Sequence, residues 1–254
     1  LSAVITGLLL AFNLPVSIPL WMVVIGSLVA IVVAKQFFGG IGQNFVNPAL
    51  AGRIVLLTSF PVAMSTWTQP LTWTMSKLDG ITSASPLSSI HEMTSGGAAP
   101  DVSLVEMLIG WRAGCLGETC AVALLLGGIY LVVRKVISPT IPLTYIGTVA
   151  VIMLIAGKGD FRFVAYELLG GGLMLGAIFM ATDYTTSPIT FKGKIIFGIG
   201  CGLITSIIRI FGNLPEGVSY SIIIMNILVP LIENVTLPKP FGTPKKEKKE
   251  AEAK

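Results

Sequence analysis

Long apolar runs separated by short polar stretches dominate the chain as far as residue 232. Leu1–Phe12 is the first run, and the others are Ile18–Phe37, Pro48–Ala63, Thr119–Val133, Ile141–Ala156, Val164–Met180, Ile195–Phe211 and Val218–Ile232. A helix needs about 20 apolar residues to cross a bilayer, so the pattern predicts an all-α polytopic membrane domain over residues 1–238 with about eight transmembrane segments. Several runs are shorter than this, which suits half-helices or helices buried inside a bundle.

The first apolar run is unusually short, and two hydrophilic stretches stand apart from the apolar pattern. Leu1–Phe12 cannot span a membrane alone, so we interpret it as the end of a truncated helix. It lacks the basic segment and small-residue cleavage site of a signal peptide. The large hydrophilic excursion covers residues 64–118, and a Lys/Glu-rich tail covers residues 239–254.

Composition supports the membrane prediction. Of the 254 residues 53% are hydrophobic and 12% are charged, whereas about a quarter are charged in a typical soluble domain. The net charge of +4 does not indicate nucleic-acid binding, because six lysines in the tail supply more than all of it. Cys115, Cys120 and Cys201 match no zinc or redox spacing and are expected to be apolar packing residues.

Charge asymmetry predicts the orientation. If the runs cross the membrane alternately, 12 lysines and arginines, including Lys35, Arg53 and the tail, lie on one side and 5 on the other. Cationic loops favour the cytoplasm. We therefore expect a cytoplasmic tail and an extracytoplasmic 64–118 loop in a cell-membrane protein.

Two interrupted segments predict paired helix starts. In Gly42–Leu50, Asn47 suits an N-cap and Pro48 the first helical position. Gly212–Val218 has a similar arrangement. On the predicted topology the starts lie on opposite sides, as in an inverted repeat whose helix N-termini face a ligand or ion path. Two ordinary capped helices are the alternative.

Asp79–Leu87 is a small-residue segment in the long loop that alone indicates only a turn. Together with four other segments, however, it resembles the RnfD/NqrB family of membrane flavoprotein subunits of ion-pumping oxidoreductases, and the short loop favours RnfD. The segments that carry the resemblance are Phe45–Arg53, Asp79–Leu87, Phe179–Pro188, Pro215–Tyr220 and Met225–Glu233.

The resemblance implies flavin cofactors. A hydroxyl in the family's Asp-x-x-(Ser/Thr)-Gly-Ala-Thr motif forms a phosphoester with FMN, installed by an FAD-dependent flavin transferase, and this position falls on Ser85. The sequence departs from the motif at Ser83 and Ser85, but serine keeps the hydroxyl. Thr82 and Ser83 are the alternative acceptors, and Asp79 and Gly80 complete the motif.

The same resemblance implies a second, non-covalent flavin, riboflavin, and a fold of two inverted five-helix repeats like that of urea transporters. It also implies partner subunits of an Rnf-type complex, including a second covalent-FMN subunit and iron–sulfur subunits. Candidate flavin-binding residues in the membrane part are Asn47, Arg53, Thr182, Asp183 and Thr185.

Ionisable residues beside or within apolar runs are candidates for an ion path, because charge at membrane depth is costly and usually functional. We select Asp183, Glu216, Asn226 and Glu233, although Asp183 and Glu233 could equally mark the membrane interface. His91 is expected to be solvated. The sequence indicates no catalytic side chain and no metal site.

These observations predict an electron-transferring subunit of an ion-translocating (Na+ or H+) ferredoxin:NAD+ oxidoreductase, inactive alone. The alternatives are an Nqr-type NADH:quinone reductase subunit, a non-redox channel or transporter of urea-transporter-like architecture, and a structural scaffold without flavin.

Overall fold

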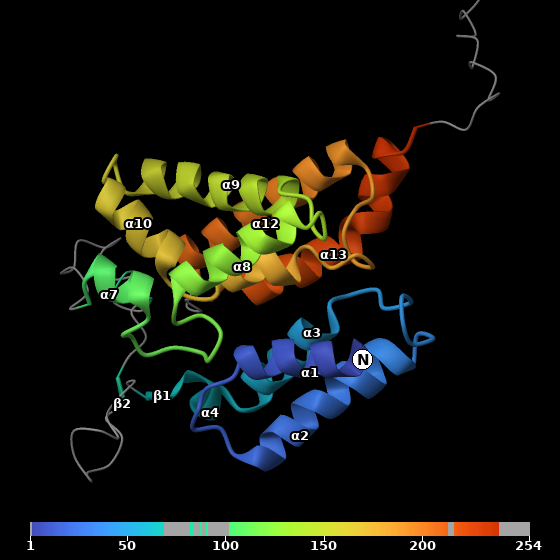
Figure 1. Cartoon of the computed structure of the whole chain (residues 1–254), viewed down its shortest axis with the longest axis horizontal. Helices are drawn as coiled ribbons and strands as arrows, with labels where there is room; N and C mark the ends of the chain where they lie inside the picture. The colour runs from blue at the N-terminus through green and yellow to red at the C-terminus, as the bar shows by residue number, and fades with distance from the viewer. Residues whose placement is uncertain are drawn as a thin grey trace, which may run out of the picture.

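The computed structural model describes residues 2–68, 82–83, 87, 90, 102–212 and 216–238. Its helices form two groups (Figure 1). The N-terminal group, drawn in blue to teal, contains α1 (Ser2–Phe12), α2 (Leu20–Leu28) with its π-helical continuation η1 (Val29–Gln36), α3 (Pro48–Ser59) and α4 (Pro61–Ser65).

The C-terminal group is drawn in green to red. It consists of α8 (Ala121–Val133), α9 (Thr140–Ala156), α10 (Phe161–Leu169), α11 (Leu173–Leu175), the π-helix η2 (Gly176–Met180), α12 (Phe191–Phe211) and α13 (Val218–Thr236). The excursion between the groups holds α7 (Leu104–Ile109) and an antiparallel pair of short strands, β1 (Trp67–Thr68) and β2 (Thr82–Ser83).

The mostly helical architecture confirms the predicted class. Among the described residues, α12 and α13 are each long and apolar enough to cross a membrane, and five other apolar helices have 10–17 residues. This agrees with the prediction of short runs in a bundle. The total of eight spans and the likeness to urea transporters stay predictions.

Two predicted runs are broken. The run at Val164–Met180 was predicted as one span, but α10 and the α11–η2 segment meet at 65°. The break falls on Gly170–Gly172, where Gly171 has φ +62°, a conformation that glycine adopts without strain. The run at Pro48–Ala63 divides at Phe60, because the following Pro61 disfavours helical backbone at the residue before it.

The two predicted helix starts have different caps. As predicted, the Asn47 side chain caps α3, accepting from the N–H groups of Ala49 (3.0 Å) and Leu50 (3.3 Å), with Pro48 at the first helical position. Helix α13 begins after Gly217 without a side-chain cap. Residues 213–215 of the second segment lie outside the described part.

Helices α3 and α13 pack together in opposite directions. At one end of the contact, the Asn47 N–H reaches the Asn226 side chain (3.0 Å, with the amide oxygen as acceptor), and at the other Arg53 pairs with Glu216. Each helix therefore starts beside a later part of the other. An inverted repeat and two ordinary antiparallel helices would both have this arrangement, so the inverted repeat stays a prediction.

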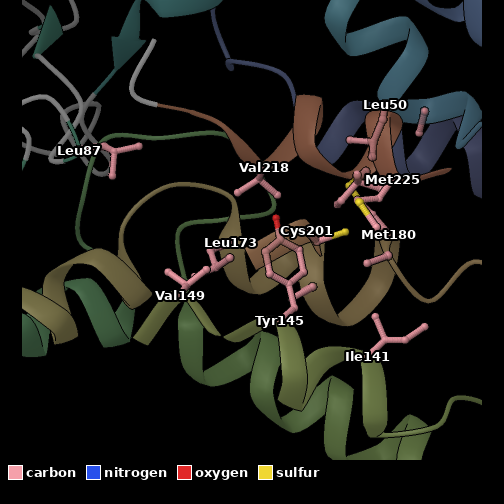
Figure 2. Packing of buried hydrophobic residues seen from close by; sticks show 14 of the residues in the cluster. Leu50, Leu87, Ile141, Tyr145, Val149, Leu173, Met180, Cys201, Val218 and Met225 are labelled. Atoms are coloured by element: carbon pink, nitrogen blue, oxygen red, sulfur yellow. The ribbon is translucent and has the colours of Figure 1, made fainter. Parts of the chain in front are cut away.

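The buried core draws residues from both helix groups, including α3, α9, α12 and α13. The Tyr145 side chain of α9 is completely buried, and its hydroxyl is hydrogen-bonded to Thr205 (2.6 Å) and Ser221 (2.9 Å). Figure 2 shows this ring near Cys201 and Val218. The predicted packing role is confirmed for the buried Cys201. Cys115 is also buried but lies among polar groups, with its thiol donating to the Asn13 carbonyl (3.3 Å), and Cys120 is only partly buried. Within the described residues, no group of three or more His, Cys, Asp or Glu side chains could hold a metal.

Candidate functional site

A cavity of about 510 Å³ lies between the N-terminal and C-terminal groups. Its walls come from α1, the segment before α3, the end of α8, and the segment that follows η2. Most of its surface is apolar, with Leu9, Leu131 and Phe179 among the lining residues. The polar side chains that line it are Ser2, Thr6, Lys35, Asn44, Asn47, Thr182, Asp183, Tyr184 and Thr185.

The Asp183 carboxylate is the acidic group of this cavity. Its Oδ2 accepts hydrogen bonds from Asn44 Nδ2 (3.4 Å), Thr185 Oγ1 (3.2 Å) and Thr186 Oγ1 (3.2 Å). Neutral donors therefore stabilise the carboxylate, and among the described residues it is in no ion pair. Its charge stays available to a ligand or cation.

Asn47 links three elements at the cavity wall. Besides capping α3, it donates from Nδ2 to the Met180 carbonyl at the end of η2 (3.1 Å). The Asn226 amide, which accepts from the Asn47 N–H, donates in turn to the Thr186 carbonyl (3.0 Å). These bonds fix the segment carrying Asp183 against α3 and α13.

Lys35 adds a positive charge to the same cavity. Its ammonium is buried, with 6% of the residue exposed, and donates to the hydroxyls of Ser2 (2.8 Å) and Thr6 (3.5 Å). Neither ion pair found in the described residues includes Lys35. The cavity thus offers an apolar body, a cation, a carboxylate and neutral hydrogen-bonding groups.

A second polar site surrounds the glycine break between α10 and α11. Arg53 pairs with Glu216 and donates to Asn13 Oδ1 (2.7 Å). Glu216 Oε1 accepts from the Gly172 N–H (3.2 Å). Arg209 pairs with Glu167 (2.8 Å) and donates to the Gly170 carbonyl (3.1 Å).

The Arg53–Glu216 contact corrects the predicted assignment of charged residues to the two sides of the membrane. Alternate crossing placed Arg53 on the cytoplasmic side and Glu216 on the other, yet the two side chains are paired inside the protein, with 3% and 17% exposed. The placement of Arg53 was wrong because it lies within α3, where it is buried by the start of α13.

Glu118 joins this second site from the segment before α8. Its Oε1 accepts from the Cys115 N–H (3.2 Å), while Oε2 is buried and has no hydrogen-bond partner in the described residues. Burial, with the nearby negative charge of Glu216, raises the pKa of Glu118 to about 7. Burial alone would also raise the pKa of Glu216, but Arg53 outweighs it and lowers that pKa.

The segment predicted to carry covalent flavin falls largely outside the described residues. This applies to Asp79, Gly80 and Ser85, as well as His91 and the tail. The backbone of Thr82–Ser83 forms β2, whose partners in β1 are Thr68 and Trp67.

Leu87 is described and is 3% exposed. A Cβ atom at Gly171 would lie 3.0 Å from Leu87 Cδ2 and 3.2 Å from Arg209 Nη2. Figure 2 shows Leu87 as one of the buried core residues. The end of the predicted flavin motif therefore packs on the glycine break.

The structure divides the predicted membrane site residues between two places. Asn47, Thr182, Asp183 and Thr185 line one cavity, with Asn226 bonded behind Asn47. Arg53 and Glu216 belong to the other site. Glu233 lies outside both and accepts from the Ile189 N–H (3.1 Å).

Sequence reasoning did not select several polar residues of these sites. Lys35 and Asn44 line the cavity, whereas Arg112, Glu118, Glu167 and Arg209 belong to the second site. Glu167 and Arg209 are charged residues inside predicted apolar runs, and Asn44 is three residues before Asn47. These positions could have marked them as candidates, but could not have assigned them to one site or the other.

Comparison with known proteins gives extensive matches. Residues 1–242 match the model of the NQR2, RnfD, RnfE family. The chain is 49% identical to the D component of the Na(+)-translocating ferredoxin:NAD(+) oxidoreductase complex of Acetobacterium woodii, over 99% of this chain and 76% of that protein. It is 45% identical to the D component of the proton-translocating ferredoxin:NAD(+) oxidoreductase complex of Clostridium ljungdahlii, over 95% and 75%. It is also 39% identical to the D component of the ion-translocating oxidoreductase complex of Stutzerimonas stutzeri, again over 95% and 75%.

Proposed function

Since the chain belongs to the NQR2, RnfD, RnfE family, we propose that it is the RnfD-type membrane component of an ion-translocating ferredoxin:NAD+ oxidoreductase complex. In this role it carries electrons through the membrane between flavins and works only with the other subunits. The observation that carries the proposal is the gathering of Asn47, Thr182, Asp183 and Thr185, all expected at a flavin, around one cavity.

The cavity has the properties needed to hold the second, non-covalent flavin. Its volume of about 510 Å³ falls within the range of about 300–1,000 Å³ typical of small-molecule sites. Apolar walls suit the ring system, and the Asn44 and Asn47 amides together with the Thr182 and Thr185 hydroxyls can hold its polar edge. A bound flavin supplies one- and two-electron transfer, while the protein sets its position and potential.

Lys35 and Asp183 give the cavity two opposed charges. The buried ammonium favours negative charge nearby, and the carboxylate can accept a cation or a proton from the same space. Sodium and proton are both possible coupling ions, since relatives named for each match this chain.

Ser85 is proposed as the acceptor of covalent FMN. Two described features flank Ser85 along the chain: β2 pairs with β1, and Leu87 packs at Gly170 and Gly171. A serine hydroxyl can form the required phosphoester. A flavin transferase that uses FAD would install it.

We propose that the Ser85 loop is extracytoplasmic and the C-terminal tail is cytoplasmic. The comparison of lysines and arginines on the two sides applies to loops. Lys35, Arg53, Arg112 and Arg209 are therefore removed from it, because they are buried inside the protein. The remaining lysines and arginines still favour this orientation. They are Arg134, Lys135, Lys192, Lys194 and the six tail lysines on one side, and Lys77, Lys158 and Arg162 on the other.

The covalent flavin is tested by in-gel fluorescence. After denaturing electrophoresis, the wild-type chain produced with its transferase should fluoresce, whereas Ser85→Ala should be dark although it still inserts in the membrane. Ser95→Ala, in the same loop, is the matched control and should keep its fluorescence. A fluorescent Ser85→Ala chain with flavin on Thr82 or Ser83 would move the acceptor, and a dark wild type would favour a non-redox transporter or scaffold.

Asp183→Asn tests the cavity. If the carboxylate serves the flavin, non-covalent flavin should be lost on purification while Ser85 fluorescence persists. If it serves the ion, both flavins should remain while electron transfer slows or loses its cation dependence. Unchanged flavin content, turnover and ion uptake would reduce Asp183 to a residue of the membrane interface.

Orientation is tested by cysteine labelling after the three native cysteines are replaced. A cysteine at Ser95 should react with an impermeant thiol reagent in intact cells, whereas one at Lys192 should react only after lysis. The opposite result would invert the proposed topology.

A further inference from the structure

Six ionisable side chains lie around the glycine break, five of them buried and the sixth, Glu216, with 17% of its side chain exposed. They are Arg53, Arg112, Glu118, Glu167, Arg209 and Glu216. Two ion pairs, Arg53–Glu216 and Arg209–Glu167, account for four of them. Arg112 and Glu118 remain.

Arg112 does not pair directly with the Glu118 carboxylate. Its Nη2 donates to the backbone carbonyl of Glu118 (2.5 Å), while Glu118 Oε2 is buried without a hydrogen-bond partner in the described residues. Only 6% of Glu118 is exposed. A buried carboxylate oxygen without a donor is costly, and binding a proton removes that cost.

The free oxygen faces the space left by Gly172. A Cβ atom at this glycine would lie 3.1 Å from Glu216 Oε1 and 3.3 Å from Glu118 Oε2. Both carboxyl groups therefore border one small space. Two carboxylates that share a site in this way favour protonation of one of them, and Arg53 holds Glu216 in the charged form.

A proton suits this space better than a metal ion. The same Cβ position lies 3.5 Å from Arg53 Nη1, so a metal there would be repelled by a guanidinium. In the described part of the chain, this space also lacks the three or more His, Cys, Asp or Glu side chains that could hold a metal.

We propose that Glu118 is a proton-binding site, and that it takes up a proton when an electron reaches the covalent flavin on Ser85. The second part rests on the proposed function. The electron comes from an iron–sulfur partner subunit and reduces the flavin. The proton comes from water and forms an O–H bond at Glu118 Oε2, so that one negative charge arrives and one is neutralised.

Leu87 provides the physical link between the two groups. It is two residues from Ser85 and packs against Gly170 and Gly171, next to Gly172. Negative charge placed nearby in a medium of low dielectric raises the proton affinity of a buried carboxyl by through-space repulsion.

Charged and titratable groups from several elements act on Glu118. Arg112 and Arg53 favour its charged form, while burial and Glu216 favour the protonated form, with a net pKa of about 7. Cys115 lies beside it, with a thiol whose pKa is raised by burial. Arg209 and Glu167 complete the surroundings as a pair. This balance poises the group to change its protonation near neutral pH.

The first experiment asks whether the site exists and does not need the flavin. Infrared spectra of the full chain in liposomes should show a protonated carboxyl band that disappears as the pH rises through about 7. Glu118→Gln should lose this band, and the control Glu106→Gln, which alters a capping carboxylate of α7, should keep it. The proposal is overturned if the band is absent from the wild type, survives in Glu118→Gln, or does not change between about pH 5 and about pH 9.

Arg112→Gln gives a shift rather than a loss, and therefore guards against a folding artefact. Because Arg112 lowers the pKa of Glu118, its neutralisation should move the titration of the carboxyl band to higher pH. An unmoved titration would contradict the proposed electrostatic environment.

The second experiment tests coupling to the electron. Chemical reduction of the flavin-loaded chain just above the titration midpoint should produce the protonated carboxyl band, and Glu118→Gln should not. In-gel fluorescence of each sample reports flavin independently. A chain without fluorescence would refute the proposed covalent flavin, and the first experiment would still decide whether Glu118 binds a proton. A fluorescent chain without the reduction-induced band would refute the coupling between the flavin and Glu118.

Discussion

The Arg53–Glu216 pair should hold α3 and α13 together, and its removal should be costly. The guanidinium is almost fully buried, and its other described acceptors are Asn13 Oδ1 at 2.7 Å and Cys115 Sγ at 3.7 Å. Neither acceptor is charged in the folded protein. The Asn13 amide is neutral, and burial raises the pKa of the Cys115 thiol well above its ordinary value. Glu216→Gln therefore leaves a buried cation without its counter-charge.

The expected loss is about 3 kcal/mol, at the lower end of about 3–5 kcal/mol for breaking a buried pair, because glutamine can still accept from the Gly172 N–H. For a chain of this size each kcal/mol corresponds to about 2–4 °C in Tm. The Tm should fall by about 6–12 °C, measured by circular dichroism in detergent.

A double-mutant cycle separates the pair from its surroundings. Arg53→Met alone should also be destabilising, because it leaves the largely buried Glu216 carboxylate without its partner. Arg53→Met combined with Glu216→Gln should recover most of the loss. Glu106→Gln is the control and should stay within about 0.5 kcal/mol of wild type, because glutamine can still complete the capping box of α7. Single variants that each cost less than about 1 kcal/mol, or a double variant whose loss equals their sum, would refute this account of the α3–α13 contact.

Three further predictions concern stability. Asn47→Ala should lower it by about 1–2 kcal/mol through loss of the α3 cap, with cavity flavin released as well; an unchanged Tm and flavin content would contradict the role given to Asn47. Gly52→Ala should cost about 1–3 kcal/mol of stability, since its Cβ would lie 2.6 Å from the Gly26 carbonyl oxygen. The control Gly147→Ala, whose Cβ would have nothing within 4 Å, should not destabilise the protein. Equal Tm changes in the two variants would refute the close packing of α2 and α3. The pKa of Glu118 rises from 4.5 to about 7 on folding, so the folded chain binds the extra proton and stability should fall as pH rises through that window, by about 3 kcal/mol in total. Unfolding measured against pH should show this fall in wild type and lack it in Glu118→Gln.

The apolar pattern was sufficient to predict the fold class because it depends on composition and spacing alone. Helices α8, α9, α12 and α13 lie close to the predicted runs. Asn47 and Pro48 likewise determined the start of α3 locally, through a side-chain cap and a fixed φ angle. The family could be recognised because its motifs are contiguous segments of the chain.

Chain breaks were harder to predict, because apolar composition does not distinguish a straight helix from a bent one. The Val164–Met180 run contains Gly170–Gly172, and glycine is tolerated in membrane helices as well as at turns. Only the packing of Leu87, Arg209 and Glu216 against these glycines shows why the chain bends there.

The sequence also identified most of the polar residues that matter, but only the tertiary structure assigned them to sites. Arg53 and Glu216 are 163 residues apart and were predicted on opposite sides of the membrane, yet they form an ion pair. Asn44 and Asp183 are 139 residues apart and meet at the cavity. Such contacts depend on how antiparallel helices pack side by side, and neither the period of a helix nor the chemistry of one residue contains that information.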